Sequence, residues 1–376
     1  MTDRAGLVRT PPLRGGLSPS AIAFRRLLRN RAAVAGATII ALVAVFSFLG
    51  PFLYPHAYDE VFSSYVRVPP RLQPYPEPAA LEAALATAAR QGRLQLGEVT
   101  FAGGRFTAAV SDTRAVDPRV TRYFDRANEF ADTAVIESRD EGRTLIVAGR
   151  VRSEYFPLGT DGNGRDLVAR MMIGGRISLA VGVLATLVSL IVGVTYGAIS
   201  GFAGGRVDNV MMRIVEIVYA LPFVFVVIVL VVFFGRNFVI IFIAIGAIEW
   251  LDMARIVRGQ ALSLRRREFV LAAEALGVKS ADVVRRHIVP NALGPVVVFV
   301  TVLVPRVILV ESFLSFLGLG VQEPLTSLGA LIAEGAANIQ AAPWLLIGPA
   351  IMFVATLFAL NFLGDGLRDA FDPRDR

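Results

Sequence analysis

Six long apolar runs, separated by charged segments, constrain this chain more than any other feature. The runs cover residues 32–54, 177–200, 208–234, 238–254, 292–318 and 343–364; the third begins with an amphipathic part, 208–219, that carries Arg213 and Glu216. A helix of about 20 apolar residues spans the roughly 30 Å hydrocarbon core of a bilayer. Lipid offers no partner to backbone polar groups, so spanning segments are helices or closed barrels. We therefore predict an all-α polytopic membrane protein with six transmembrane helices.

The composition supports a membrane protein. Hydrophobic residues make up 55% of the 376 residues, above the 45–50% that is ordinary for soluble proteins. The absence of cysteine excludes disulfide frameworks, thiolate chemistry and cysteine-based metal sites. The net charge of +7 comes from arginines that lie beside apolar runs, which indicates cytoplasmic loops and argues against nucleic acid as a partner.

The distribution of arginine predicts the orientation. Residues 1–31, 201–213, 255–286 and the C-terminal tail carry arginine, whereas residues 319–342 carry neither arginine nor lysine. By the positive-inside rule, both termini of this multi-pass membrane protein then lie in the cytoplasm. The first run, 32–54, lacks an A-x-A cleavage pattern and exceeds a signal-peptide core, so we interpret it as an uncleaved span.

The segment 55–165 differs sharply from the rest of the chain. Charges of both signs return, and five prolines cluster at residues 69–78. Residues 79–90 favour a helix by propensity, and 94–110 alternate around Gly103-Gly104 as a β-hairpin would. With a further strand-like run at 143–155, this predicts a small α/β insert outside the membrane. The predicted order is a cytoplasmic segment (1–31), a first span (32–54), the insert (55–165) and a core membrane domain (166–376).

The polar loop 255–291 lies between two spans and carries eight basic residues. We predict a short helix over 265–276 that Gly277 ends as a C-cap, then a second helix over 280–287 with Ser280 as N-cap, ending before Pro290. A solvated basic loop would explain the arginines. It would not explain the apolar run of residues 269–273, which favours docking against a cytosolic partner.

This loop also resembles a known family. Ala272-Ala273, Gly277 and His287-Ile288-Val289-Pro290 have the spacing of the "EAA loop" of ABC-importer permeases, with Leu271 where the family has Glu. Residues 255–264 narrow the resemblance to dipeptide, oligopeptide and nickel permeases. The residues for which the resemblance implies coupling to an ATPase are Arg267, Phe269, Leu271, Ala272, Ala273, Gly277, His287 and Pro290.

Three further segments are similar to the C-type subunits of these permeases. They are residues 157–179, 311–320 and 363–369, in the same order as in the family. The resemblance implies the type I ABC-importer permease fold and a heterodimer with a second permease. It also implies two cytoplasmic ATPase subunits and a periplasmic or lipid-anchored substrate-binding protein. Peptides are the expected cargo, with nickel or another small solute as the alternative.

Motifs for catalysis by this chain itself are missing. The sequence contains no Gly-x-x-x-x-Gly-Lys-Ser/Thr loop, so we expect ATP and Mg²⁺ on partner ATPase subunits and no cofactor or metal on this chain. His56 and His287 are expected on opposite membrane faces, which disfavours a metal site. Two rivals stay open: a stand-alone secondary transporter, disfavoured by the lack of a clear inverted repeat, and a ligand sensor.

Two groups of residues are candidates for contact with cargo. Arg306 and Glu311 lie within the fifth span, where ionisable groups face a cavity or a partner; the alternative is an ion pair, with each other or with a neighbouring subunit, that fixes helix packing. The outer-mouth candidates either contact cargo or its binding protein, or form a turn in which the aspartates cap helices. They are Gly159, Thr160, Asp161, Arg165 and Asp166.

Overall fold

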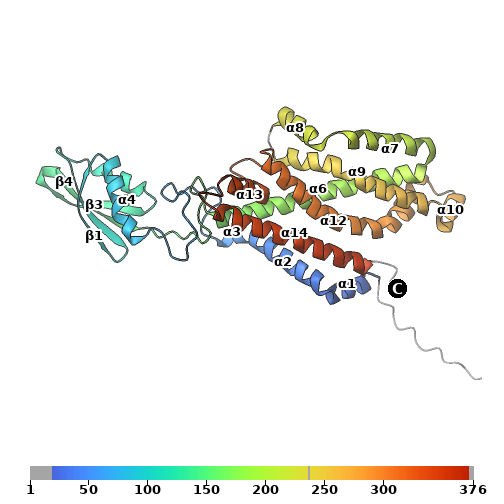
Figure 1. Cartoon of the computed structure of the whole chain (residues 1–376), viewed down its shortest axis with the longest axis horizontal. Helices are drawn as coiled ribbons and strands as arrows, with labels where there is room; N and C mark the ends of the chain where they lie inside the picture. Colours follow the sequence, from blue (N-terminus) through green and yellow to red (C-terminus); the bar gives the residue numbers. More distant parts are fainter. Residues whose placement is uncertain (1–18, 236–237, 372–376) are drawn as a thin grey trace, which may run out of the picture.

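The computed structural model describes residues 19–235 and 238–371, which form a helical bundle with a small sheet domain at one end (Figure 1). We call the end of the bundle that carries this domain the insert end. The helices of the bundle are α1 (Pro19–Arg29), α2 (Arg31–Phe48), α3 (Gly50–Leu53), α6 (Leu167–Ala203), α7 (Gly205–Ala220), α8 (Phe223–Phe234), α9 (Phe238–Leu264), α10 (Glu268–Ala275), α11 (Ser280–Val283), α12 (Val289–Phe316), α13 (Leu328–Ala337) and α14 (Trp344–Phe371).

The described helices match the expected membrane frame. Four are long and apolar enough to cross a bilayer: α2, α6, the continuous helix Ser280–Phe316, and α14. A bent pair, α7 and α8, makes a fifth if it is one span. The remaining predicted span corresponds to α9, which carries Glu249, Asp252 and Arg255 along its 27 residues. The fold class is the predicted one.

The third predicted span is not a straight helix. The axes of α7 and α8 differ by 82° at the break between them. Leu221 adopts an extended conformation (φ −74°, ψ 131°) immediately before Pro222. Proline removes a backbone donor and disfavours helical geometry in the residue before it. The Leu221-Pro222 pair therefore breaks the run 208–234, which sequence reasoning treated as one element.

Glycines bring α6 against α9. An added Cβ at Gly193, Gly197 or Gly201 would lie 2.5, 2.3 or 2.6 Å from atoms of α9. These glycines recur every four residues, so they line one face of α6 and let the two backbones approach closely. The Gly193–Gly201 stripe therefore places α9, with its ionisable residues, directly beside α6.

The chain passes Pro290 without a break, which corrects the prediction that a helix ends before it. Residues 284–288 form a π-helical turn between α11 and α12, and the whole stretch Ser280–Phe316 is one helix. A π turn shifts the hydrogen-bond register, so a residue that lacks an N–H is accommodated more easily. Ser280 is the first helical residue and not the N-cap, which is Lys279.

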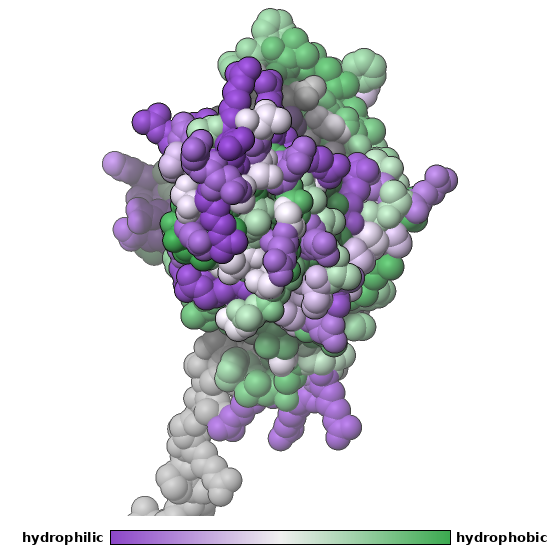
Figure 2. Space-filling model, turned by 90° about the vertical axis from the view of Figure 1, so that its left-hand side faces the viewer, coloured by the Kyte–Doolittle hydropathy of each residue, from purple (hydrophilic) through white to green (hydrophobic). Residues whose placement is uncertain are grey.

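The insert is an antiparallel sheet with helices against it. Strands β1 (Gln95–Ala102), β2 (Arg105–Ser111), β3 (Phe130–Arg139) and β4 (Thr144–Val151) are ordered β1-β2-β4-β3. Helix α4 (Pro78–Gln91) and short α5 (Thr121–Asp125) cover a core that includes Leu85, Phe106 and Phe124. Viewed from the insert end, the surface of the insert is largely hydrophilic, and apolar surface of the bundle shows behind it (Figure 2).

The expected helix 79–90 and the hairpin around Gly103-Gly104 are both present. Strand β3 was not predicted. Its pairing with β4 shifts register twice, and Asp132 has φ +53°, a left-handed backbone. Such bulges interrupt the alternation of apolar and polar residues on which strand prediction depends.

Candidate functional sites

Helix α10 lies at the end of the bundle away from the insert (Figure 1). The helix begins at Glu268, three residues later than predicted, and Gly277 follows it with φ +76°. The N–H of Gly277 donates to Glu274 O (3.0 Å), and the N–H of Val278 donates to Ala273 O (3.1 Å). These two bonds form a Schellman motif, in which glycine tolerates the left-handed backbone. The predicted C-cap is confirmed.

The coupling loop, residues 255–291 as predicted, divides its apolar residues between two environments. Val270 and Ala273 are buried against Ile288 and the ends of α6 and α9. Phe269, Leu271 and Leu276 are 42%, 52% and 84% exposed. Arg255–Leu264 form the last turns of α9 and are not loop, because that helix continues to Leu264. The loop is thus a short helix fixed along one side, with apolar side chains exposed on the other.

Of the other predicted coupling residues, His287 is half-buried and its ring centroid lies 6.2 Å from that of Phe269. Ala272, Pro290 and Arg267 are exposed. The structure therefore gathers Phe269, Leu271, Ala272 and His287 around α10, whereas Pro290 lies in the first turn of α12.

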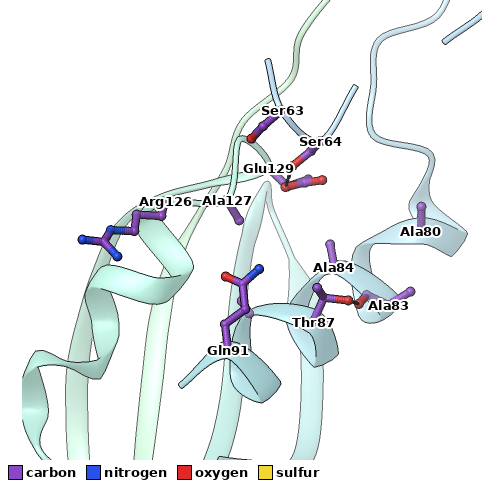
Figure 3. Close-up of a pocket in the computed structure, with 11 residues that line it drawn as sticks. Ser63, Ser64, Ala80, Ala83, Ala84, Thr87, Gln91, Arg126, Ala127 and Glu129 are labelled. Atoms are coloured by element: carbon purple, nitrogen blue, oxygen red, sulfur yellow. Dashed lines mark hydrogen bonds between the residues drawn. The ribbon is translucent and has the colours of Figure 1, made fainter. Parts of the chain in front are cut away.

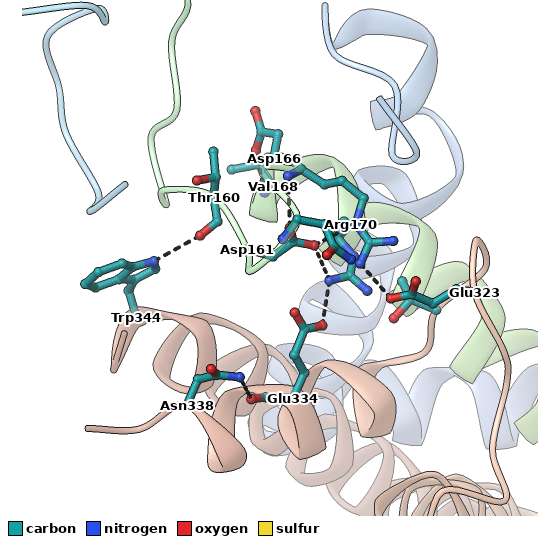
Figure 4. A network of polar contacts seen from close by, with 12 residues as sticks. Thr160, Asp161, Asp166, Val168, Arg170, Glu323, Glu334, Asn338 and Trp344 are labelled. Carbon is teal, nitrogen blue, oxygen red and sulfur yellow. Dashed lines mark hydrogen bonds and ion pairs between the residues drawn. The ribbon is translucent and has the colours of Figure 1, made fainter. Parts of the chain in front are cut away.

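At the insert end, Asp161 is the centre of a buried ion-pair network (Figure 4). Its Oδ2 lies 2.7 Å from Arg165 Nε and 2.5 Å from Arg170 Nη1. Arg165 continues to Glu323 (2.7 Å), and Arg170 to Glu334 on α13 (2.6 Å). Asp161 Oδ1 also accepts the backbone N–H of Arg165 (2.9 Å). Asp161 therefore closes its own loop and ties the start of α6 to α13, and does not cap a helix as predicted.

The residues just before Asp161 are fitted closely to the neighbouring loop. Thr160 Oγ1 donates to Tyr65 O and accepts the N–H of Val68 (3.0 Å). Gly159 has φ +79°, and an added Cβ would lie 2.4 Å from Val68 O. Trp344 Nε1 donates to Thr160 O (3.4 Å). This turn is packed between the insert linker and the start of α14.

Asp166 caps α6, as predicted, by accepting the N–H of Val168 (2.7 Å). Its other oxygen accepts the hydroxyl of Tyr54 (2.7 Å) and lies 2.6 Å from Nδ1 of buried His56. The second ring nitrogen of His56 lies 3.2 Å from Glu154. Burial by itself would lower the pKa of His56, but Asp166 and Glu154 outweigh it and raise the pKa above its ordinary value.

Sequence reasoning missed most partners in these two clusters. Arg170, Glu334 and Glu323 close the network of Asp161, and Tyr54, His56 and Glu154 meet at Asp166. His56 and Asp166 are 110 residues apart in sequence. A lone histidine directly after an apolar span, with acidic residues elsewhere outside the membrane, was the available signal, and it does not identify the partner.

Arg306 is part of α12, and its side chain is paired with two acidic residues of α9. Its Nη1 is 3.0 Å from Asp252 Oδ2, and its Nε is 3.6 Å from Glu249 Oε2. The side chain of Arg306 is 50% exposed, while that of Glu249 is 7% exposed. The predicted alternative, an ion pair of Arg306 with Glu311, is wrong, because a separation of five positions places the two side chains on different faces of α12.

Glu311 is fully enclosed in the structure. It accepts hydrogen bonds from Ser315 (2.7 Å) and from Ser178 on α6 (3.2 Å). Ser178 in turn accepts the N–H of Leu328, the first residue of α13. Glu311 therefore joins α12, α6 and α13 and is not exposed at the surface of this chain.

The insert has a cavity of about 370 Å³ beside α4 (Figure 3). One wall is α4, with small side chains such as Ala83, Ala84 and Thr87. Ser64 donates to Glu129 (2.9 Å) on the opposite side. The cavity is lined by polar and small side chains, and Ser64 directly precedes Tyr65, whose carbonyl accepts the hydroxyl of Thr160.

The bundle of apolar helices thus carries the short capped helix α10 at one end and the α/β insert at the other (Figure 1). Residues 193–376 match the family described as "Binding-protein-dependent transport system inner membrane component". Residues 18–74 match "N-terminal TM domain of oligopeptide transport permease C". Both matches lie outside most of the insert.

Individual relatives agree. "Oligopeptide transport system permease protein OppC" of Salmonella typhimurium is 62% identical over 237 residues, which cover 63% of this chain and 78% of the relative. The protein of the same name from Escherichia coli is 59% identical over 222 residues, 59% of this chain and 73% of the relative. "Dipeptide transport system permease protein DppC" of Lactococcus lactis is 35% identical over 357 residues, 94% of this chain and 90% of the relative. That alignment includes most of the insert.

The chain therefore belongs to the inner-membrane permeases of ABC peptide transport, in the branch of the C-type subunits. The predicted resemblance is confirmed.

Proposed function

We propose that this chain is a permease subunit of an ATP-driven importer and forms half of the pathway that carries di- or oligopeptides across the inner membrane. The observation that carries this proposal is the 62% identity to an oligopeptide permease over 78% of that relative. ATP and Mg²⁺ bind to separate ATPase subunits. The family resemblance also allows an alternative cargo, which is nickel or another small solute.

The partners follow from the same family. A second permease completes the pathway, two ATPase subunits bind at the α10 end, and a substrate-binding protein delivers cargo at the insert end. Both termini then lie in the cytoplasm, and the insert is extracytoplasmic. The exposed faces of Phe269, Leu271 and Leu276 supply the apolar surface that an ATPase would cover.

Helix α10 suits the transfer of motion because it is short and held at several points. Val270 and Ala273 anchor it on the ends of α6 and α9, and the Schellman motif at Gly277 fixes its exit. A displacement of α10 by an ATPase would therefore move the bundle and not merely bend a flexible loop. This chain has Leu271 where the family has glutamate, so its contact with an ATPase is more apolar than a contact made by glutamate.

The test is co-purification from native membranes of the wild type, Leu271→Arg and a matched control, Leu72→Arg. Leu72 is 85% exposed and lies in the insert linker, so the control introduces the same charge away from α10. We expect an ATPase subunit with the wild type and the control and none with Leu271→Arg. An ATPase retained by Leu271→Arg would contradict docking at α10. No ATPase in any sample, with solute uptake intact, would favour a secondary transporter.

A further inference from the structure

The ionisable group of Arg306, Asp252 and Glu249 lies deep in the membrane domain. Glu249 is eleven residues into α9, about 16 Å from its start at a rise of about 1.5 Å per residue. On α12, Arg306 lies fourteen residues into the apolar run 292–318, near the middle of that run. Charges at such depth are expensive in lipid and face water, protein or cargo.

The exposed face around Arg306 is mixed and not uniformly apolar. Val302, Leu309 and Phe313 on the same side of α12 are 53%, 51% and 52% exposed, and Arg306 stands among them at 50%. A face that met only lipid would not carry a half-exposed arginine and an aspartate beside it. This face therefore meets water, cargo or a partner subunit in addition to lipid.

One acceptor in the group lacks a hydrogen bond. Glu249 Oε2 is buried and accepts no hydrogen bond from any described residue, although Arg306 lies 3.6 Å away. A buried carboxylate oxygen gains substantially from a charged donor. An incoming ammonium group supplies such a donor.

We propose that Arg306, Asp252 and Glu249 form a mid-membrane binding site for the charged ends of a peptide in transit. Arg306 pairs with the peptide carboxylate, and Glu249 and Asp252 receive the α-ammonium group. Between passages Arg306 lies against Asp252 and Glu249, and Arg255 lies 3.9 Å from Asp252, so two arginines offset the two carboxylates. The apolar residues Val302, Leu309 and Phe313 accept uncharged side chains of varied sequence. This site rests on the proposed function as a peptide permease.

The test uses the complete importer reconstituted in liposomes, with trialanine as the probe. The variants are Arg306→Gln, the charge swap Asp252→Arg with Arg306→Asp, and the control Arg213→Gln. Arg213 pairs with Glu216 on α7, so the control also removes one arginine from an ion pair. The readouts are ATP-dependent uptake and the ATPase activity stimulated by the binding protein.

We expect Arg306→Gln to lower uptake about tenfold while stimulated ATPase activity stays within about twofold. The charge swap restores an ion pair between α9 and α12 but reverses the charges that face Glu249 and Arg255, so uptake does not recover. Full uptake in the charge swap, or unchanged uptake in Arg306→Gln, would overturn the site and leave only a packing role. No uptake by the wild type would overturn peptide import itself, and the site with it.

Discussion

The two ends of the membrane domain differ in whether their side chains find partners within the chain. At the insert end, Asp161, Arg165 and Arg170 are at most 4% exposed and paired with one another. At the α10 end, apolar residues such as Leu276 stay exposed on a helix that is fixed only along its other side. The insert end pairs its buried charges within this chain, apart from Arg170 Nε, whereas the α10 end leaves apolar side chains uncovered.

This difference has a physical basis. Buried charges must be paired within the chain, because an unpaired charge costs several kcal/mol. Exposed apolar side chains on a water-facing helix cost less individually and are covered when a partner binds. Mutations at the insert end should therefore affect stability, and mutations at the α10 end should affect assembly and coupling.

The largest expected effect is on Asp161. Asp161→Ala leaves Arg165 and Arg170 buried without their shared carboxylate, and we expect a loss of about 3–5 kcal/mol of stability. The midpoint of heat-induced unfolding in detergent measures it. The matched control is Glu323→Gln, because Glu323 is 62% exposed and its ion pair should be worth less than about 1 kcal/mol. Equal destabilisation by both variants would refute a network centred on Asp161.

A smaller effect is expected at Gly277, and it tests the α10 end by backbone strain alone. Gly277→Ala places a side chain at φ +76°, although no atom lies within 4 Å of the added Cβ. We expect a cost of about 1 kcal/mol and weaker coupling of ATPase activity to uptake. The control is Gly259→Ala, because Gly259 also has open space around it but lies inside α9. This substitution should leave the free energy of unfolding unchanged or raise it. Two variants with the same unfolding midpoint would contradict the capping role.

The smallest effect concerns His56 and depends on pH. Its pKa is raised in the folded protein, so its pairing with Asp166 and Glu154 contributes fully below the ordinary pKa of about 6.5. The contribution is lost as the pH rises through the higher folded value. The unfolding midpoint of the wild type should therefore exceed that of His56→Gln by more at about pH 6 than at about pH 8. A difference that grows with pH would reverse this interpretation.

Much of the fold could be predicted because its causes are local. Apolar runs become helices in lipid wherever they are long enough. The end of α10 at Gly277 and the hairpin at Gly103-Gly104 depend on residues within a few positions of the turn. Leu221-Pro222 was an equally local signal for the bend between α7 and α8, and it was overlooked. The unpredicted strand β3 has bulges that hide its period.

The candidate sites were predicted less completely. Arg306 was identified as an unusual charge and Asp161 as an outer-mouth candidate, but their partners Asp252 and Arg170 were not identified. Glu311 was expected on the same path as Arg306, and the structure instead encloses it among serines of α6 and α12. A buried charge needs a partner of opposite charge, but the sequence offers many acidic and basic residues and does not show which of them is the partner.

The sequence by itself determined the membrane class, the approximate spans, the soluble insert and the capped helix of the coupling loop. Each of these depends on hydrophobic period or on backbone preference over a few neighbouring residues. Only the tertiary structure decided that His56 meets Asp166 and that Arg306 meets α9. Those contacts join residues 110 and 54 positions apart, so they depend on how whole helices pack and not on local preference.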